Sequence, residues 1–149
     1  MRFSYRFQTL LNWKKNLEEL SQMQLAGKME ELKKQEEEIE RIKGLRTDSD
    51  RRLTEESTKG MEAGAYLLYK EFGEDRLNDL LRKEGEKKST LTEIEEVREE
   101  LIGFMRETKI LDRVKEKDLR KFTDEMEKSD QKKIDEMVVM RRSSSGTTR

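Results

Sequence analysis

The chain of 149 residues contains no proline, no cysteine and no histidine. The lack of cysteine and histidine excludes disulfides, thiolate nucleophiles, imidazole bases and the common zinc sites. Hydrophobic residues are also scarce, at 32% of the chain, whereas charged residues make up 45% and nearly cancel to a net charge of −1. This composition is typical of coiled coils and long helices rather than of a globular core.

Long hydrophobic runs are missing as well. No apolar stretch approaches the ~20 residues that a membrane-spanning helix needs, and residues 1–7 lack the apolar region of a secretory signal. We therefore expect a soluble, cytoplasmic protein.

The sequence offers little that resembles a catalytic or ligand site. The acidic runs at 36–38 and 95–96 are neighbours on a helix and point in different directions, so they predict a solvated face. The GxxxG pattern at 60–64 has meaning only within an apolar membrane helix. There is no phosphate-binding loop. We expect no enzymatic activity, and no metal, cofactor or small-molecule substrate.

What the sequence does contain is helical periodicity. Leu25, Leu32 and Ile39 recur every seven residues, and Leu53 resumes the column after Arg46. Steps of three and four residues mark a second seam. Its two columns are Ile94, Leu101, Thr108, Lys115 and Phe122, and Val97, Phe104 and Leu111.

Glycine, serine and threonine take the place of proline as helix breakers. They favour one helix over about 3–57, a turn near 57–62, a second helix over about 63–140 and a flexible tail at 141–149. A capping box at 90–93 is the alternative, in which the second helix restarts there. The fold class is all-α, with the two helices in an antiparallel coiled-coil hairpin; an intermolecular coiled coil is the rival arrangement.

Basic residues gather near both ends of the chain. Residues 1–17 hold four basic and no acidic side chains, and residues 140–149 hold three and none, so the interior carries −8. If the hairpin closes, the two segments meet at one end and suit an acidic partner surface. Ordinary variation of the surface charge is the plain alternative. Nucleic acid is disfavoured, because the pI is 5.9 and aromatic residues do not interleave with the basic ones.

An aromatic cluster, Tyr66, Tyr69 and Phe72, follows the expected turn. At about 100° per residue these side chains spread over a broad face, so they cannot all contact the opposite helix. They either close the seam at the tip or form an exposed patch that docks a partner; the two readings are compatible.

Three segments together resemble the FliJ family over nearly the whole chain. They are the opening FSYRFQTLL at 3–11, the mid-chain Gly60 followed by Tyr66 and Tyr69, and the close formed by LDRVKEK at 111–117 with QKKIDE at 131–136. Ile134 stands where leucine is more usual. The resemblance depends on the order of all three segments, because coiled-coil proteins share composition.

The resemblance implies a non-enzymatic component of the flagellar type III export apparatus, a stalk-like helical hairpin in the cytoplasm at the inner face of the membrane. Implied partners are the hexameric export ATPase, the export gate membrane protein and export chaperones. The basic end is then expected to dock in the ATPase ring, and the tip residues Tyr66, Tyr69 and Phe72 to engage the gate. A virulence-type secretion stalk and a structural coiled-coil spacer are the alternatives. The residues of the basic end are Arg2, Arg6, Lys14, Arg141 and Arg142.

Overall fold

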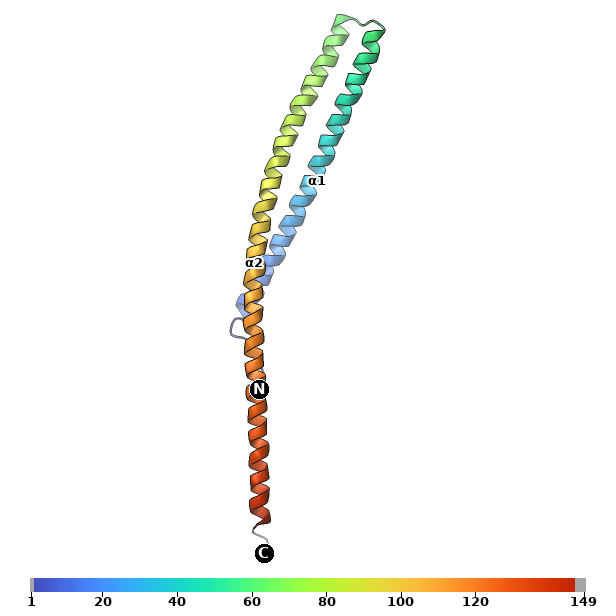
Figure 1. Cartoon of the computed structure of the whole chain (residues 1–149). Helices are drawn as coiled ribbons and strands as arrows, with labels where there is room; N and C mark the ends of the chain where they lie inside the picture. Colours follow the sequence, from blue (N-terminus) through green and yellow to red (C-terminus); the bar gives the residue numbers. More distant parts are fainter. Residues whose placement is uncertain (1, 147–149) are drawn as a thin grey trace. The chain divides into compact units, whose positions relative to one another are not determined.

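The computed structural model describes residues 2–146, which form two helices, α1 (Gln8–Thr58) and α2 (Ala63–Ser145), without a strand among them (Figure 1). The all-α fold class is therefore confirmed. The helices contribute to two compact units. Unit 1 combines Met1–Glu18 with Gly103–Arg149, and unit 2 is Glu19–Ile102.

In unit 2 the two helices run antiparallel. Lys28 Nζ lies 2.7 Å from the Glu93 carboxylate, and Lys87 Nζ lies 3.7 Å from the Glu36 carboxylate. The residue number therefore rises along α1 as it falls along the facing part of α2. The two apolar stripes cover each other within one chain, so the predicted hairpin is confirmed.

The turn between the helices depends on one glycine. Gly60 has a φ of +92°, a backbone conformation that suits glycine, and it follows directly after the last turn of α1. The amide of Lys59 donates to the carbonyl of Glu56 at 3.2 Å, and α2 then starts with the Tyr66 amide bonded to the Glu62 carbonyl at 3.1 Å. With no proline in the chain, α2 runs on without the restart that the capping box offered.

The seam of unit 2 is thin. Its most buried apolar side chains are Ile39, Ile42 and Ile94, each 2–3% exposed. The remaining members of the predicted heptad columns are half-buried, which places them at the helix interface as the periodicity indicated. Small polar residues fill several other seam positions, which leaves little apolar area to hold the helices together. The buried polar side chains of unit 2 are Ser21, Ser49 and Thr90, and Thr108 is buried in unit 1.

The hydroxyl group of Thr108 lacks a hydrogen-bond partner, and this leads to a stability prediction. Its Oγ1 is buried and has no hydrogen-bond partner among the described residues, whereas Thr90 Oγ1 donates to the Glu86 carbonyl at 3.1 Å. Because a buried unpaired hydroxyl is costly, we expect Thr108→Val to raise the free energy of unfolding by about 1 kcal/mol. Urea unfolding measures the change, and Thr90→Val is the matched control, for which no gain is expected. Equal gains in the two variants would contradict this account.

In unit 1 an N-terminal arm, residues 2–7, precedes α1 and packs along α2. The Phe3 and Phe122 ring centroids are 5.6 Å apart, and the Tyr5 hydroxyl donates to the Leu111 carbonyl at 2.9 Å. Burial raises the pKa of Tyr5, and the negative charges of Asp118 and Asp112 act in the same direction. The arm is thus held by one tilted pair of aromatic rings and one part-buried hydrogen bond.

The expected start of the first helix near residue 3 is wrong, since α1 begins at Gln8. Tyr5 and Leu11 are both buried. Six residues apart on a continuous helix, they would point in directions about 120° apart around the helix axis. The chain therefore leaves the helix before Gln8 so that both side chains can be buried.

The expected tail also needs correction, because α2 continues through Arg141 and Arg142 to Ser145. Nothing before Gly146 breaks the helix, and the three serine hydroxyls each donate to the carbonyl three residues earlier, at 2.9–3.0 Å. Residues 147–149 of the predicted tail lie outside the described residues.

Candidate functional site

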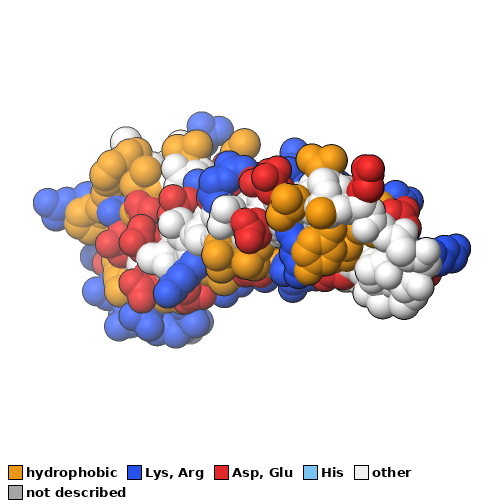
Figure 2. All heavy atoms as spheres, turned by 90° about the horizontal axis from the view of Figure 1, so that it is seen from above, with side chains coloured by type: hydrophobic (Ala, Val, Ile, Leu, Met, Phe, Trp, Pro, Cys, Tyr) orange, Lys and Arg blue, Asp and Glu red, His pale blue; other side chains and the backbone are white. Residues whose placement is uncertain are grey.

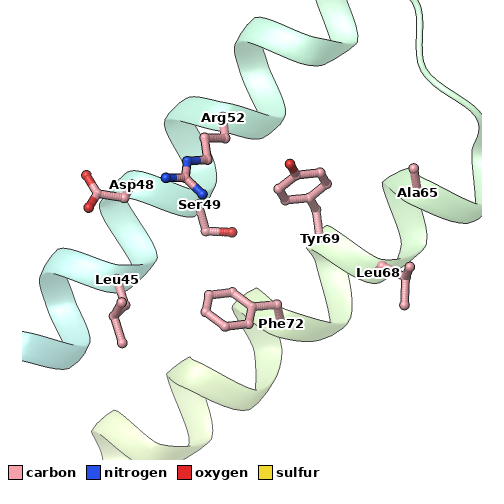
Figure 3. A pocket seen from close by; sticks show the side chains of 8 residues that line it. All are labelled: Leu45, Asp48, Ser49, Arg52, Ala65, Leu68, Tyr69 and Phe72. Carbon is pink, nitrogen blue, oxygen red and sulfur yellow. The ribbon is translucent and has the colours of Figure 1, made fainter.

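Exposed hydrophobic side chains are spread among charged ones of both signs on the surface (Figure 2). Within unit 2, such side chains line an open groove of about 470 Å³ between the two helices near the turn. Its lining residues come from both helices, so the groove exists only in the folded hairpin (Figure 3). They are Leu45, Asp48, Ser49, Arg52, Ala65, Leu68, Tyr69 and Phe72.

Two aromatic rings form the α2 wall of this groove. Tyr69 and Phe72 point from α2 toward α1, whereas Asp48 points away from the groove (Figure 3). The Phe72 side chain is 38% exposed and carries the Arg76 guanidinium 5.2 Å from its ring centroid. The groove is therefore mainly apolar, with cationic groups at its edge.

The hydroxyl of Tyr69 lies in a less polar environment than water. Partial burial raises its pKa, and the Glu56 carboxylate beside the hydroxyl adds to the shift. Tyr69 therefore stays neutral at physiological pH and presents a ring with a hydrogen-bonding tip, as aromatic residues at binding surfaces often do.

The structure separates the three predicted tip residues. Tyr69 and Phe72 line the groove, but Tyr66 does not. Tyr66 is 42% exposed, and Lys70 Nζ lies 5.5 Å from its ring centroid. The drift across a broad face that the spacing predicted is thus observed, and it divides the cluster into two groove residues and one outer residue.

The α1 wall of the groove was missed by sequence reasoning. Ser49 lies seven residues after Ile42, so a small side chain occupies a seam position that an apolar residue would normally fill. Ala65 is similarly small on the facing helix. Two small residues in the seam leave the volume of the groove. Within α1, the heptad column of Ser49 contains only one apolar residue, Ile42, so the sequence contained no clear signal for this wall.

The residues predicted to form the basic end differ in their exposure in the structure. Arg2 and Arg6 are exposed on the arm, with the Arg6 guanidinium 5.4 Å from the centroid of the Phe7 ring. The ammonium group of Lys14 is largely engaged in contacts within the protein. Its ammonium lies 2.6 Å from the Glu107 carboxylate, 4.9 Å from the Trp13 ring and 5.9 Å from the Phe104 ring, and its side chain is only 19% exposed.

The prediction that the two basic segments meet is wrong. The arm reaches α2 at Phe122, and Arg141 follows 19 residues later on the same helix. At about 1.5 Å per residue this is about 28 Å along α2. Unit 1 therefore has two separate basic positions, because α2 continues beyond the point where the arm ends (Figure 1).

No described helix combines the length and hydropathy of a membrane span. Residues 2–146 contain no group of three or more acidic side chains placed to hold a metal ion.

Comparison with known proteins identifies the family. The family model described as flagellar FliJ protein matches residues 3–147, almost the whole chain. The chain belongs to the FliJ family. No curated protein and no solved structure matches it.

Family membership makes the chain a component of flagellar-type protein export. The match includes residues 3–7 of the N-terminal arm, the turn and the complete C-terminal part of α2 down to Ser145. The groove and the basic residues Arg6, Arg141 and Arg142 therefore lie within the family region, and Arg2 directly precedes it.

Proposed function

We propose that this FliJ family member is a non-catalytic, stalk-like subunit that binds the hexameric export ATPase and promotes its assembly and turnover. The match to the family over residues 3–147 carries the proposal. The two long helices, which pair side by side in unit 2, are in keeping with a role through contact. Hydrolysis then belongs to the ATPase.

The ATPase contact is assigned to the basic positions of unit 1. Arg2 and Arg6 are exposed on the arm, and Arg141 and Arg142 are exposed near the end of α2. Because the interior of the chain carries −8, these positions stand out as the positive part of the sequence and favour steering toward an acidic surface. Lys14 contributes mainly by holding α1 to α2 through Glu107.

Titration of the protein into its cognate export ATPase tests this function, with hexamer formation and ATP turnover as readouts. We expect Arg2→Glu with Arg6→Glu to weaken binding by at least about tenfold at low salt and to flatten its salt dependence, because long-range attraction is screened by salt.

Lys33→Glu with Lys34→Glu is the matched control. It changes the net charge equally at two exposed positions of unit 2, and we expect it to retain most of the affinity. Unchanged low-salt affinity in the Arg2 and Arg6 variant would overturn the assignment of the arm. Wild-type protein that leaves both hexamer formation and turnover unchanged would overturn the function and favour a structural spacer.

The second part of the proposal concerns the hairpin tip. We propose that the groove lined by Tyr69 and Phe72 engages the export gate membrane protein, which brings the chain to the inner face of the membrane at the flagellar base. An open, mainly apolar groove with aromatic walls is the kind of surface that seats a partner's side chains. Tyr66 lies outside the groove and is assigned a peripheral part.

Export chaperones complete the proposed set of partners. No residue is assigned to them. We expect a chaperone to be retained by the immobilised protein, and to be retained equally by the groove and arm variants if its site is separate. A nucleic-acid role is not favoured, because the pI of 5.9 and the acidic interior oppose binding to phosphates.

A further inference from the structure

Two arginines lie on facing sides of the seam in unit 2. The ion pairs between α1 and α2 in this unit fix the register of facing residues. Continued along both helices in equal steps, this register places Arg46 of α1 opposite Arg76 of α2. Arg46 stands seven residues after Ile39 and seven before Leu53, so it occupies a column that otherwise turns apolar side chains toward the seam. We call Arg46 and Arg76 the arginine pair.

The charge of the arginine pair is not fully compensated by the rest of unit 2. The Nε atom of each arginine is buried and has no hydrogen-bond partner among the described residues. Arg46 makes no ion pair with any described residue. The Arg76 guanidinium lies 3.3 Å from the Asp79 carboxylate, which Arg82 shares at 3.8 Å. Because unpaired buried donors of a charged group are costly, the arginine pair is suited to a negative group from another molecule.

Two further acids lie close to the arginine pair in the sequence. Asp50 follows Arg46 by one helical turn, and Asp75 directly precedes Arg76. Both acids are exposed, and neither makes an ion pair with a described residue. Water and salt screen exposed charges, so these acids compensate the arginine pair only weakly.

The arginine pair lies at the end of the groove that is farther from the turn. The Arg76 guanidinium lies over the ring of Phe72, which lines the groove. Arg46 directly follows Leu45, which lines the groove from α1. A group held by the arginine pair is therefore next to the apolar wall.

The end of the groove nearer the turn is closer to electrostatic balance. Arg52 lines the groove there, and the Glu56 carboxylate offsets it, since the two act in opposite directions on the pKa of Tyr69. Asp48, the acidic member of the lining, points away from the groove and lies 3.3 Å from Arg51 (Figure 3). The excess of positive charge along the groove is therefore at the arginine pair.

We propose that the groove binds an acidic peptide segment of its partner. An apolar side chain of this segment packs on the rings of Tyr69 and Phe72, and a neighbouring carboxylate accepts hydrogen bonds from the arginine pair. This assignment rests on the proposed contact between the groove and the export gate, and it names the chemistry of the segment that the groove selects. The apolar side chain supplies most of the affinity, and the carboxylate fixes the direction in which the segment lies.

Two other occupants fit the same residues less well. A free inorganic anion compensates the arginine pair but leaves the aromatic wall of the groove in water. A nucleic acid brings many phosphates to a chain whose interior carries −8. Only an apolar group beside a carboxylate uses both the wall and the arginine pair.

Fluorescence anisotropy of the full chain with two labelled synthetic peptides tests the proposal. In one peptide a central leucine–phenylalanine pair is flanked on each side by two aspartates, and in the other by two asparagines. We expect the aspartate peptide to bind at least about tenfold more tightly, because the asparagine peptide lacks the carboxylate. The net charge of −1 gives the chain no general attraction for acidic peptides. Equal affinities would overturn the proposal.

Arg46→Gln with Arg76→Gln is expected to remove this preference. The aspartate peptide should lose at least about tenfold in affinity, and the asparagine peptide should change by less than about threefold. Glutamine is a good helix former and the variant removes two opposed like charges, so helicity and the urea midpoint should not fall. A markedly lower urea midpoint would show that contacts within the chain compensate the arginine pair, and would overturn the proposal.

Arg51→Gln with Arg98→Gln is the matched control. It makes the same charge change at two exposed arginines of unit 2 that lie outside the groove and have ion-pair partners on their own helices. We expect its affinity for the aspartate peptide to lie within about threefold of the native value. Equal losses in the two double variants would overturn the proposal in favour of general charge attraction. Stabilisation by inorganic phosphate that needs the arginine pair, without a peptide preference, would overturn it in favour of a small-anion site.

The cytoplasmic part of the gate protein, titrated in parallel, separates this assignment from the gate contact. If the native chain prefers the aspartate peptide but does not bind the gate protein, the gate contact is overturned and the peptide chemistry is supported. If gate binding depends on Tyr69 and Phe72 but not on the arginine pair, the gate contact is supported and the present assignment is overturned.

Discussion

Alanine at both Tyr69 and Phe72 is expected to weaken binding to the export gate by at least about 100-fold. Both rings line the groove of unit 2 from the α2 side, where they form most of its apolar wall. Truncation of a buried aromatic anchor at an interface costs about 2 kcal/mol or more, and two anchors in one groove act together. The residual groove would keep Leu45 and Leu68 but lose its shape.

Tyr66→Ala provides the matched control for the groove variant. Tyr66 is an aromatic residue on the same helix, one turn earlier, and it does not line the groove. We expect it to change gate affinity by less than about fivefold. Isothermal titration with the cytoplasmic part of the gate protein measures the difference, and circular dichroism checks that helicity is retained. A groove variant that binds like the native chain would refute the tip assignment.

Leu11→Ala is expected to lower the free energy of unfolding of unit 1 by about 3 kcal/mol. Leu11 is 0% exposed, the most completely buried side chain among the described residues. Removal of a buried leucine loses its transfer free energy and leaves a cavity, at a total cost of about 2–5 kcal/mol. The neighbouring contacts of Tyr5 with Leu111 and of Lys14 with Glu107 are expected to loosen with it.

Leu10→Ala tests whether burial, and not helix propensity, causes this loss. Leu10 is adjacent in sequence and 39% exposed, so we expect a cost below about 1 kcal/mol. The single tryptophan, Trp13, lies in unit 1, and its fluorescence follows the urea unfolding of this unit. Equal costs in the two variants would show that Leu11 is not a core residue.

The heptad columns predicted the seam because a helix turns by a fixed angle per residue. Ile39 and Ile94 were placed on opposite stripes by spacing alone, and both are nearly fully buried. The groove was only half predicted. Tyr69 and Phe72 were singled out as aromatics near a turn, whereas Leu45 and Arg52 join them only when the two helices are brought side by side.

The predictions from the sequence were wrong where side chains far apart in the sequence contact each other. Tyr5 ends the helical path before Gln8 because its hydroxyl reaches the Leu111 carbonyl, a contact across 106 residues. Lys14 was assigned to the basic end that docks the ATPase, but its ammonium lies beside the Glu107 carboxylate and two aromatic rings. The spacing of neighbouring residues in the sequence carries no information about such long-range contacts.

The missing proline, the high charge and the three-and-four-residue spacing of the apolar side chains determined from the sequence alone that this protein is helical. These properties are local, because propensity and periodicity act within a few residues. Only the tertiary structure showed that α2 continues beyond the point where the N-terminal arm packs against it. The pairing register places Phe3 at Phe122 and leaves the helix from Glu127 onward exposed, which separates the two basic positions.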